Sequence, residues 1–263
     1  MKNQKLLLQK MSGVSLMLLL FLFFSNCAGG GGTFSTDVWN ITYDDQEGGI
    51  SLTYKSKNIC NGMYASYQWE GKEIKTSDYA RHKISTGKVS DSFGKGHIYK
   101  VEYTDKELPE LTQYFYLYPD KEYILTDFTV EAKEEISSAK MAPVNVDSIS
   151  GFLQAGDNRA LFVPFDNDKW IRYQSHPLAF DTLVSYEVTA IFNNESRNGL
   201  VIGSVEHDNW KTAISIGKGM NDNIGSLVCY GGIADEQTRD VKAHGALVGK
   251  KINFLYPFPT GTF

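Results

Sequence analysis

The sequence predicts an all-β protein built as an antiparallel two-sheet β-sandwich. Apolar and polar residues alternate along much of the chain, which is the pattern of half-buried strands. Turn signals recur about every eight to twelve residues, with almost no helical periodicity and no alternation of strands with helices. Neither a fixed-period repeat nor an internal linker divides the chain after its glycine-rich start, so we expect one domain over residues 38–263.

The clearest strands are expected in residues 111–130. One face carries Leu111, Gln113, Phe115 and Leu117, and the other carries Tyr114, Tyr116 and Tyr118. Pro119-Asp120-Lys121 supplies a turn, and Ile124, Phe128 and Val130 continue an inward row. Because tyrosines fill the second face, we expect that face to be partly covered as well.

Two other segments alternate in the same way. Tyr99, Val101 and Tyr103 oppose Ile98, Lys100 and Glu102. Further along, Tyr186, Val188, Ala190 and Phe192 share one face, and the chain returns after Asn198-Gly199. Asn-Gly is a strong hairpin signal, so residues 185–205 are expected to form a hairpin.

The first residues have the composition of a secretory signal. Three lysines precede a run of about eleven apolar residues, which is shorter than the roughly 20 that a membrane-spanning helix needs. Cys27 follows at a place that loosely resembles a bacterial lipoprotein signal, with Asn26 where a small residue is usual. We therefore expect a signal peptide over 1–26, a lipid-attachment and glycine-rich tether over 27–37, and an exported protein of the periplasm or outer membrane. Ordinary cleavage near Cys27, without lipid, is the alternative.

Net charge limits the classes of partner that we expect, and the cysteine count limits the possible disulfides. Removing the three signal lysines takes the formal charge of −5 to −8, which argues against nucleic acid and against an anionic membrane surface as partners. Any membrane contact is expected through the lipid anchor alone. Cys60 and Cys229 could pair in an oxidising compartment, but we expect two independent core residues.

Motifs for common cofactors are missing. The sequence contains no H-E-x-x-H, C-x-x-C, G-x-S-x-G or phosphate-binding loop, so we expect no cofactor. The "DNDKW" segment resembles the start of a calcium loop but lacks the third oxygen ligand, the glycine and the distant glutamate. The histidines are scattered without ligand spacing, and no metal site is expected.

The segment "AGDNRALFVPFDNDKWIRY" is the best candidate for a binding site. An apolar strand lies between polar loops, and the second loop holds Asp166, Asp168, Trp170 and Arg172. Carboxylates and guanidinium groups bond sugar hydroxyls while tryptophan stacks on the apolar face of a sugar ring. Taken alone, the same residues are typical of a solvated loop with one packed tryptophan and an ion pair.

Four segments resemble a known family when taken together: "SFGKGHIYKVEY", "LTQYFYLYPDKEYILTDFTV", "FVPFDNDKW" and "SYEVTAIFNNESRNGLVIGSVEHDNWKTAI". They are similar to the N-terminal β-supersandwich of melibiase-type α-galactosidases and their raffinose-synthase relatives, those of gut Bacteroidetes in particular. The resemblance runs from about Val38 to Lys250 and implies a galactose-mutarotase-like supersandwich. It also implies a galactoside ligand and a following barrel that carries the nucleophile and the acid/base as two aspartates.

The chain ends before such a barrel, at "INFLYPFPTGTF". This apolar ending could be a last strand, the point where a longer chain is cut, or a tail in a shifted frame, and we expect a truncated product. We expect no catalytic residue in the chain. In the family the sandwich lends loop residues to the sugar pocket at the barrel mouth, and residues 166–172 are our candidates for that role. The polar cluster "EHDNW", residues 206–210, is expected to be structural.

Three functions remain open at this stage. The chain is the N-terminal domain of an exported α-galactosidase and inactive alone, or a free-standing carbohydrate-binding lipoprotein, or a complete glycosidase that uses Asp166 and Asp168. Residues two apart on a strand share a face with Cα atoms nearly 7 Å apart, so the third is geometrically conceivable but needs a pocket.

Overall fold

A computed structural model describes residues 32–45, 48–119, 121–149, 151–165, 172–205, 211–219, 223–232 and 247–259, with backbone only for 247–248 and 253–259. These residues lie in one compact unit, Gly31–Phe263. Apart from the single 3-10 turn η1 (Thr76–Asp78), their regular structure is entirely β-strand, which confirms the all-β prediction. The described residues contain no helix long and apolar enough to cross a membrane.

The largest sheet has nine strands and forms one layer. Its order is β1-β2-β3-β4-β10-β17-β16-β13, with β5 paired to β4, and every pairing is antiparallel. The strands are β1 (Thr33–Ser35), β2 (Trp39–Asp44), β3 (Gly49–Tyr54), β4 (Lys57–Trp69), β5 (Lys72–Lys75), β10 (Lys140–Val146), β13 (Thr182–Tyr186), β16 (Lys211–Lys218) and β17 (Ile224–Gly232). Strand β1 falls inside the segment expected as a tether.

Two smaller antiparallel sheets complete the fold. The five-stranded sheet, in the order β18-β9-β8-β7-β6, contains β6 (Arg81–Asp91), β7 (Gly94–Thr104), β8 (Glu110–Leu117), β9 (Tyr123–Ser138) and β18 (Leu247–Pro259). The four-stranded sheet, in the order β12-β11-β14-β15, contains β11 (Asn158–Phe162), β12 (Gln174–Pro177), β14 (Val188–Asn193) and β15 (Gly199–Gly203). The apolar stretch Leu247–Pro259 is therefore a strand, paired along nearly the whole of β9.

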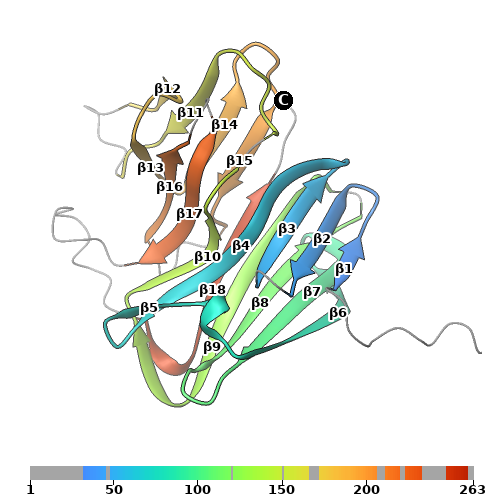
Figure 1. The fold of residues 1–263 in the computed structure, drawn as a ribbon, viewed down its shortest axis with the longest axis vertical. Helices are drawn as coiled ribbons and strands as arrows, with labels where there is room; N and C mark the ends of the chain where they lie inside the picture. The colour runs from blue at the N-terminus through green and yellow to red at the C-terminus, as the bar shows by residue number, and fades with distance from the viewer. Residues whose placement is uncertain are drawn as a thin grey trace, which may run out of the picture. The chain divides into compact units, whose positions relative to one another are not determined.

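The two smaller sheets contact different parts of the large one. Strand β9 contacts β4 and β10, and β18 contacts β10, whereas β11 contacts β13 and β14 contacts β13 and β16 (Figure 1). Strand β15 also contacts β18. The arrangement is a β-sandwich with the nine-stranded sheet on one side and the two smaller sheets on the other.

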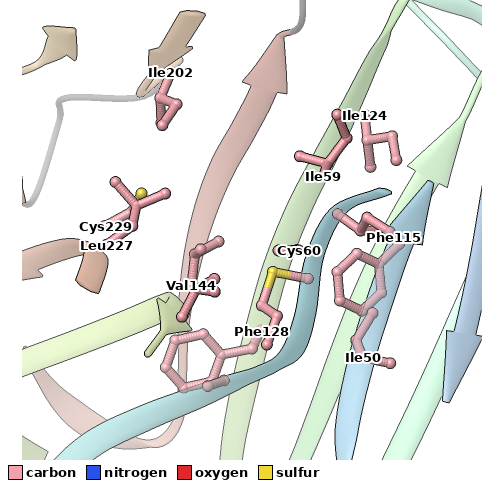
Figure 2. Packing of buried hydrophobic residues seen from close by; sticks show 14 of the residues in the cluster. Ile50, Ile59, Cys60, Phe115, Ile124, Phe128, Val144, Ile202, Leu227 and Cys229 are labelled. Atoms are coloured by element: carbon pink, nitrogen blue, oxygen red, sulfur yellow. The ribbon is translucent and has the colours of Figure 1, made fainter. Parts of the chain in front are cut away.

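A single apolar core fills the space between the layers. The large sheet contributes Ile50, Cys60 and Val144, and the five-stranded sheet contributes Phe115 and Phe128, all of them buried (Figure 2). Removing a buried phenylalanine of this kind costs about 3–5 kcal/mol. Packing between sheets is therefore the main source of stability.

The two cysteines of this core do not form a disulfide. Cys60 and Cys229 are both buried. Figure 2 shows them apart, with Cys229 near Leu227 of its own strand. Burial raises the pKa of the Cys60 thiol to about 12, so it behaves as a small apolar side chain.

The predicted strands in residues 98–130 are confirmed in detail. Leu111, Gln113, Phe115 and Leu117 are fully buried on β8, whereas Tyr114 and Tyr116 are half-buried on the opposite face. Tyr99, Val101 and Tyr103 are buried on β7. Ile124, Phe128 and Val130 form the expected inward row on β9.

Residues 185–192 differ from the prediction because Glu187 interrupts them. Its φ of 64° ends β13, and β14 begins at Val188 in another sheet. The buried side chains of β14 are Thr189, Ile191 and Asn193, not the set that contains Val188. The sequence predicted one strand here, whereas the structure has two strands, β13 and β14, which belong to different sheets.

The expected hairpin exists as β14–β15, but its turn precedes the Asn-Gly pair. Arg197 has the positive φ, 62°, and Gly199 already pairs with Phe192. A Cβ at position 199 would lie 2.5 Å from the Ile191 carbonyl oxygen. Gly199 therefore allows a close approach of backbones and does not make the turn itself.

A bulge at Pro143 links the two layers. The register of β10 shifts at this residue against both β4 and β17, because proline has no N–H to donate. The Gln113 side chain, fully buried on β8, donates to the Pro143 carbonyl at 3.2 Å and accepts from the Tyr103 hydroxyl at 3.4 Å. Asn145 donates to the carbonyls of Tyr64 and Ala142 beside the bulge.

Replacing Gln113 by leucine is expected to destabilise the protein by about 1–3 kcal/mol, because it removes a donor from a buried carbonyl and an acceptor from a buried hydroxyl. Urea unfolding followed by circular dichroism measures the change. Gln68→Leu, at an exposed position of β4, is the matched control and should change the stability by less than about 0.5 kcal/mol. Equal stability of the two variants would contradict the role given to Gln113.

Candidate functional site

The described residues that directly precede the two polar segments noted in the sequence, Phe165 and Val205, follow strands that end at the same end of the four-stranded sheet. Phe162 pairs with Gln174, so β11 ends where β12 begins, and Val188 pairs with Gly203, so β14 begins where β15 ends. The chain leaves this end after Phe165 and again after Val205. We call it the loop end, made of residues 163–165, 172–173, 187–188 and 203–205.

Exposed apolar side chains gather at the loop end. Tyr173, Val188 and Val205 are 60%, 37% and 44% exposed, and they are the large hydrophobic residues that stand out as exposed in the described part of the chain. All three are at or next to the paired strand ends just named. Exposed apolar residues near one another make the loop end the candidate binding surface of the described residues.

An aromatic and cationic contact ties the two polar segments together at their bases. The Phe165 and Tyr186 rings meet edge to face, with centroids 5.0 Å apart, and the Lys211 ammonium lies 4.4 Å from the Phe165 centroid. Phe165 directly precedes residues 166–171, and Lys211 directly follows residues 206–210. The residues that flank these two segments, Phe165 and Lys211, are therefore in contact, although more than 40 residues separate them in sequence.

Buried hydroxyls hold the base of the loop end. Ser185 accepts a hydrogen bond from the Val163 amide at 2.9 Å and donates to the Val188 carbonyl at 2.7 Å. Thr189 donates to the Leu161 carbonyl at 2.7 Å. Both hydroxyl residues are fully buried. Their bonds fix β11, β13 and β14 relative to one another and give the loops a rigid support.

The predicted site residues are only partly within the described chain. Arg172 is exposed at the loop end, next to Tyr173. Asp166, Asp168 and Trp170 lie outside the described residues, as do residues 206–210 and Cys27. The assignment of sugar-binding roles to these residues therefore stays a prediction.

Two polar residues of the same segment lie at the other end of β11 and have local partners. Arg159 pairs with Asp157 at 3.2 Å and donates to the Ser175 carbonyl at 2.8 Å. Asp157 also accepts from the Asn194 side chain at 3.0 Å. Their hydrogen bonds join strand β11 to strand β12 and to the β14–β15 turn, and they do not belong to the loop end.

Sequence reasoning missed Tyr173, Val188, Val205 and Lys211. The sequence signal that could have identified Tyr173 and Val205 is an apolar residue directly next to a polar loop segment, where polar residues are usual. No group of three or more His, Cys, Asp or Glu side chains within the described residues has a geometry that could hold a metal ion.

Comparison with known proteins identifies the fold. No protein-family model matches the sequence, and no curated protein matches it. Among solved structures, the GH36 α-galactosidase AgaB of Geobacillus stearothermophilus matches with a TM-score of 0.55 and 11% identity over 91% of this chain and 41% of that one. The galactosidase domain of the α-galactosidase-sucrose kinase AgaSK matches with a TM-score of 0.56 and 9% identity, over 88% and 40%.

A third similar structure is the α-N-acetylgalactosaminidase NagBb of Bifidobacterium bifidum in complex with GalNAc, with a TM-score of 0.51 and 9% identity, over 85% and 35%. At these identities the likeness shows a shared fold. The chain spans about two fifths or less of each of these three proteins.

Glu187 gives a test of the loop-end backbone. Its amide donates to the Thr212 carbonyl and its carbonyl accepts from the Ser204 amide, so its left-handed conformation is held from both sides. Glu187→Gly should leave the free energy of unfolding unchanged or raise it by up to about 1 kcal/mol, whereas Glu187→Val should lower it by about 1–3 kcal/mol. Thermal unfolding compares the two, and the reverse order would show that Glu187 is not strained.

Proposed function

We propose that this chain is the N-terminal sandwich domain of an exported α-galactosidase-like glycoside hydrolase and is inactive alone. One observation carries the proposal: 85–91% of the chain superimposes on known galactoside-cleaving enzymes, yet accounts for only 35–41% of their length. The remaining length of such an enzyme would contain the catalytic centre. Descent from the Bacteroidetes enzymes in particular is part of this proposal and rests on the sequence resemblance.

The loop end is the part of the domain that we assign to the sugar. Retaining glycoside hydrolysis needs two carboxyl groups about 5–5.5 Å apart, one ionised and one protonated, and we place both on a barrel outside the sandwich domain. Tyr173 and Arg172 at the loop end supply an aromatic face and a guanidinium for hydroxyl groups. Trp170, Asp166 and Asp168 extend the same segment. These groups would contact a galactoside held at the barrel mouth.

A second candidate is a free-standing carbohydrate-binding lipoprotein. The 60% exposure of Tyr173, beside Arg172, favours it because an aromatic platform of this kind can bind sugar without a catalytic domain. The protein would then present galactosides to a separate enzyme.

Purified residues 28–263 are expected to show no turnover of an aryl α-galactoside, because the catalytic carboxylates would lie elsewhere. Release of the chromogenic aryl group measures the rate. Hydrolysis that Asp166→Asn abolishes would instead establish a complete glycosidase and overturn both proposals.

Binding separates the two candidates. In calorimetric titration with melibiose, the free-standing binder is expected to bind with a Kd of about 1 mM or tighter, and Trp170→Ala or Arg172→Ala should weaken it by about tenfold, which is about 1.4 kcal/mol. Arg197→Ala, at the opposite end of the same sheet, is the matched control and should bind like the unchanged protein. Absence of binding, or binding that Trp170→Ala and Arg172→Ala leave unchanged, would favour the domain of a larger enzyme.

We also propose that Cys27 carries a lipid that anchors the exported protein. Its position after an apolar run and a short polar stretch supports this. Cells labelled with a palmitate analogue should yield labelled protein, and Cys27→Ser should lose the label. Label that survives the substitution, or is absent from the unchanged protein, would refute the anchor.

A further inference from the structure

A cleft that is remote from the loop end in sequence opens where the five-stranded sheet meets the end of β4. It has a volume of about 680 Å³ and is lined by Trp69, residues 105–110 and residues 131–133. We call it the acid-rimmed cleft. Its residues come from the end of β4, the β7–β8 loop and the facing parts of β8 and β9, so both layers contribute to it (Figure 1).

The floor of the cleft is apolar and firmly supported. Trp69, Leu108 and Ala132 are partly buried and pack against the hydrophobic core. The Tyr79 hydroxyl donates to the Pro109 carbonyl at 2.7 Å. Burial raises the pKa of Tyr79, so the hydroxyl keeps its proton and the bond. The floor is therefore preformed for a ligand with an apolar face.

The loop that forms one wall is fixed by Asp105. Its carboxylate accepts from the Glu107 amide at 2.9 Å and from the Ala80 amide at 3.4 Å. The hydrogen bond from the Glu107 amide, followed by that from Ala80, lowers the pKa of Asp105. Asp105 therefore stays ionised and acts as a structural part of the wall, which leaves the other carboxylates to face a ligand.

The rim contains a pair of like charges that the fold itself does not need. Glu110 and Glu131 are directly opposite each other on β8 and β9, an arrangement that destabilises a sheet by up to about 1 kcal/mol. Lys251 lies 3.5 Å from Glu131, but both side chains are about 60% exposed, so this ion pair contributes little. Among the described residues Glu110 has no ion pair. A pair that costs stability at the mouth of a cleft points to a role in binding.

We propose that the acid-rimmed cleft binds a neutral pyranose sugar, with Trp69 against the apolar face of the ring and the Glu110 and Glu131 carboxylates accepting hydrogen bonds from its hydroxyls. Lys106 and Lys133 line the same cleft and donate to hydroxyl or ring oxygens. These ammonium groups offset much of the negative charge and make the cleft a poor site for a cationic peptide. The inference does not depend on the function proposed for the loop end.

The test uses the purified protein and the methyl glycosides of galactose, glucose and mannose, titrated by NMR. At least one glycoside is expected to bind with a Kd in the millimolar range, and Glu110→Gln should weaken it by about tenfold. The same substitution removes the repulsion from Glu131, so the melting temperature should stay the same or rise. If Glu110 had only a structural role, the substitution would not weaken binding while leaving the melting temperature unchanged or higher.

Three comparisons complete the design. Trp69→Phe keeps the packed floor and should weaken binding moderately, whereas Glu135→Gln, at an exposed position farther along β9, should not change it. Arg172→Ala should leave binding at the cleft intact, which separates this site from the loop end. Binding that Glu110→Gln and Trp69→Phe do not affect, binding of no glycoside, or Glu110-dependent binding of an oligolysine peptide in place of sugars would each overturn the proposal.

Discussion

The bulge at Pro143 connects the two layers on which the rest of the structure depends. A proline in a central strand removes one ladder donor, and β10 accommodates it by shifting register against both neighbours. The carbonyl freed from the ladder accepts from Gln113 of the opposite layer, and Asn145 donates to carbonyls on either side of the bulge. Strand β10 is also where the large sheet passes from the five-stranded sheet toward the four-stranded one. The two candidate sites lie on the two parts of the molecule that meet at this strand.

The sequence predicted the strands whose alternation is uninterrupted, and it failed where a single residue changes the direction of the chain. Residues 111–117 alternate without a break, so the buried face could be assigned residue by residue. At Glu187 the left-handed conformation carries no sequence signal, since Asn or Gly is usual there and glutamate is not. The alternating pattern therefore predicted one continuous strand across Glu187, where the chain in fact moves to another sheet. Which sheet a strand joins depends on contacts far away in sequence.

The candidate site was predictable in the same partial way. Polar and aromatic residues between two strands marked residues 166–172, of which the structure describes Arg172, exposed beside Tyr173; the sugar-binding role of the segment stays a prediction. Sequence alone could not bring Phe165 and Lys211 together, because their contact follows from the pairing of β13 with β16 and the connection from β11. Likewise Glu110 and Glu131 appear as two unrelated surface acids until the register of β8 and β9 sets them opposite each other.

The two surfaces differ in a way that argues for different uses. At the loop end, exposed apolar side chains lie at and next to strand ends held by buried hydroxyl groups, which suits a surface that meets another domain or an extended ligand. The acid-rimmed cleft has a packed apolar floor with charges at its mouth, which suits a small ligand with one apolar face. A domain that served only as a scaffold would gain stability by replacing Tyr173 with a polar residue and Glu110 with a neutral one. We attribute both features to contact with a ligand, one at each surface.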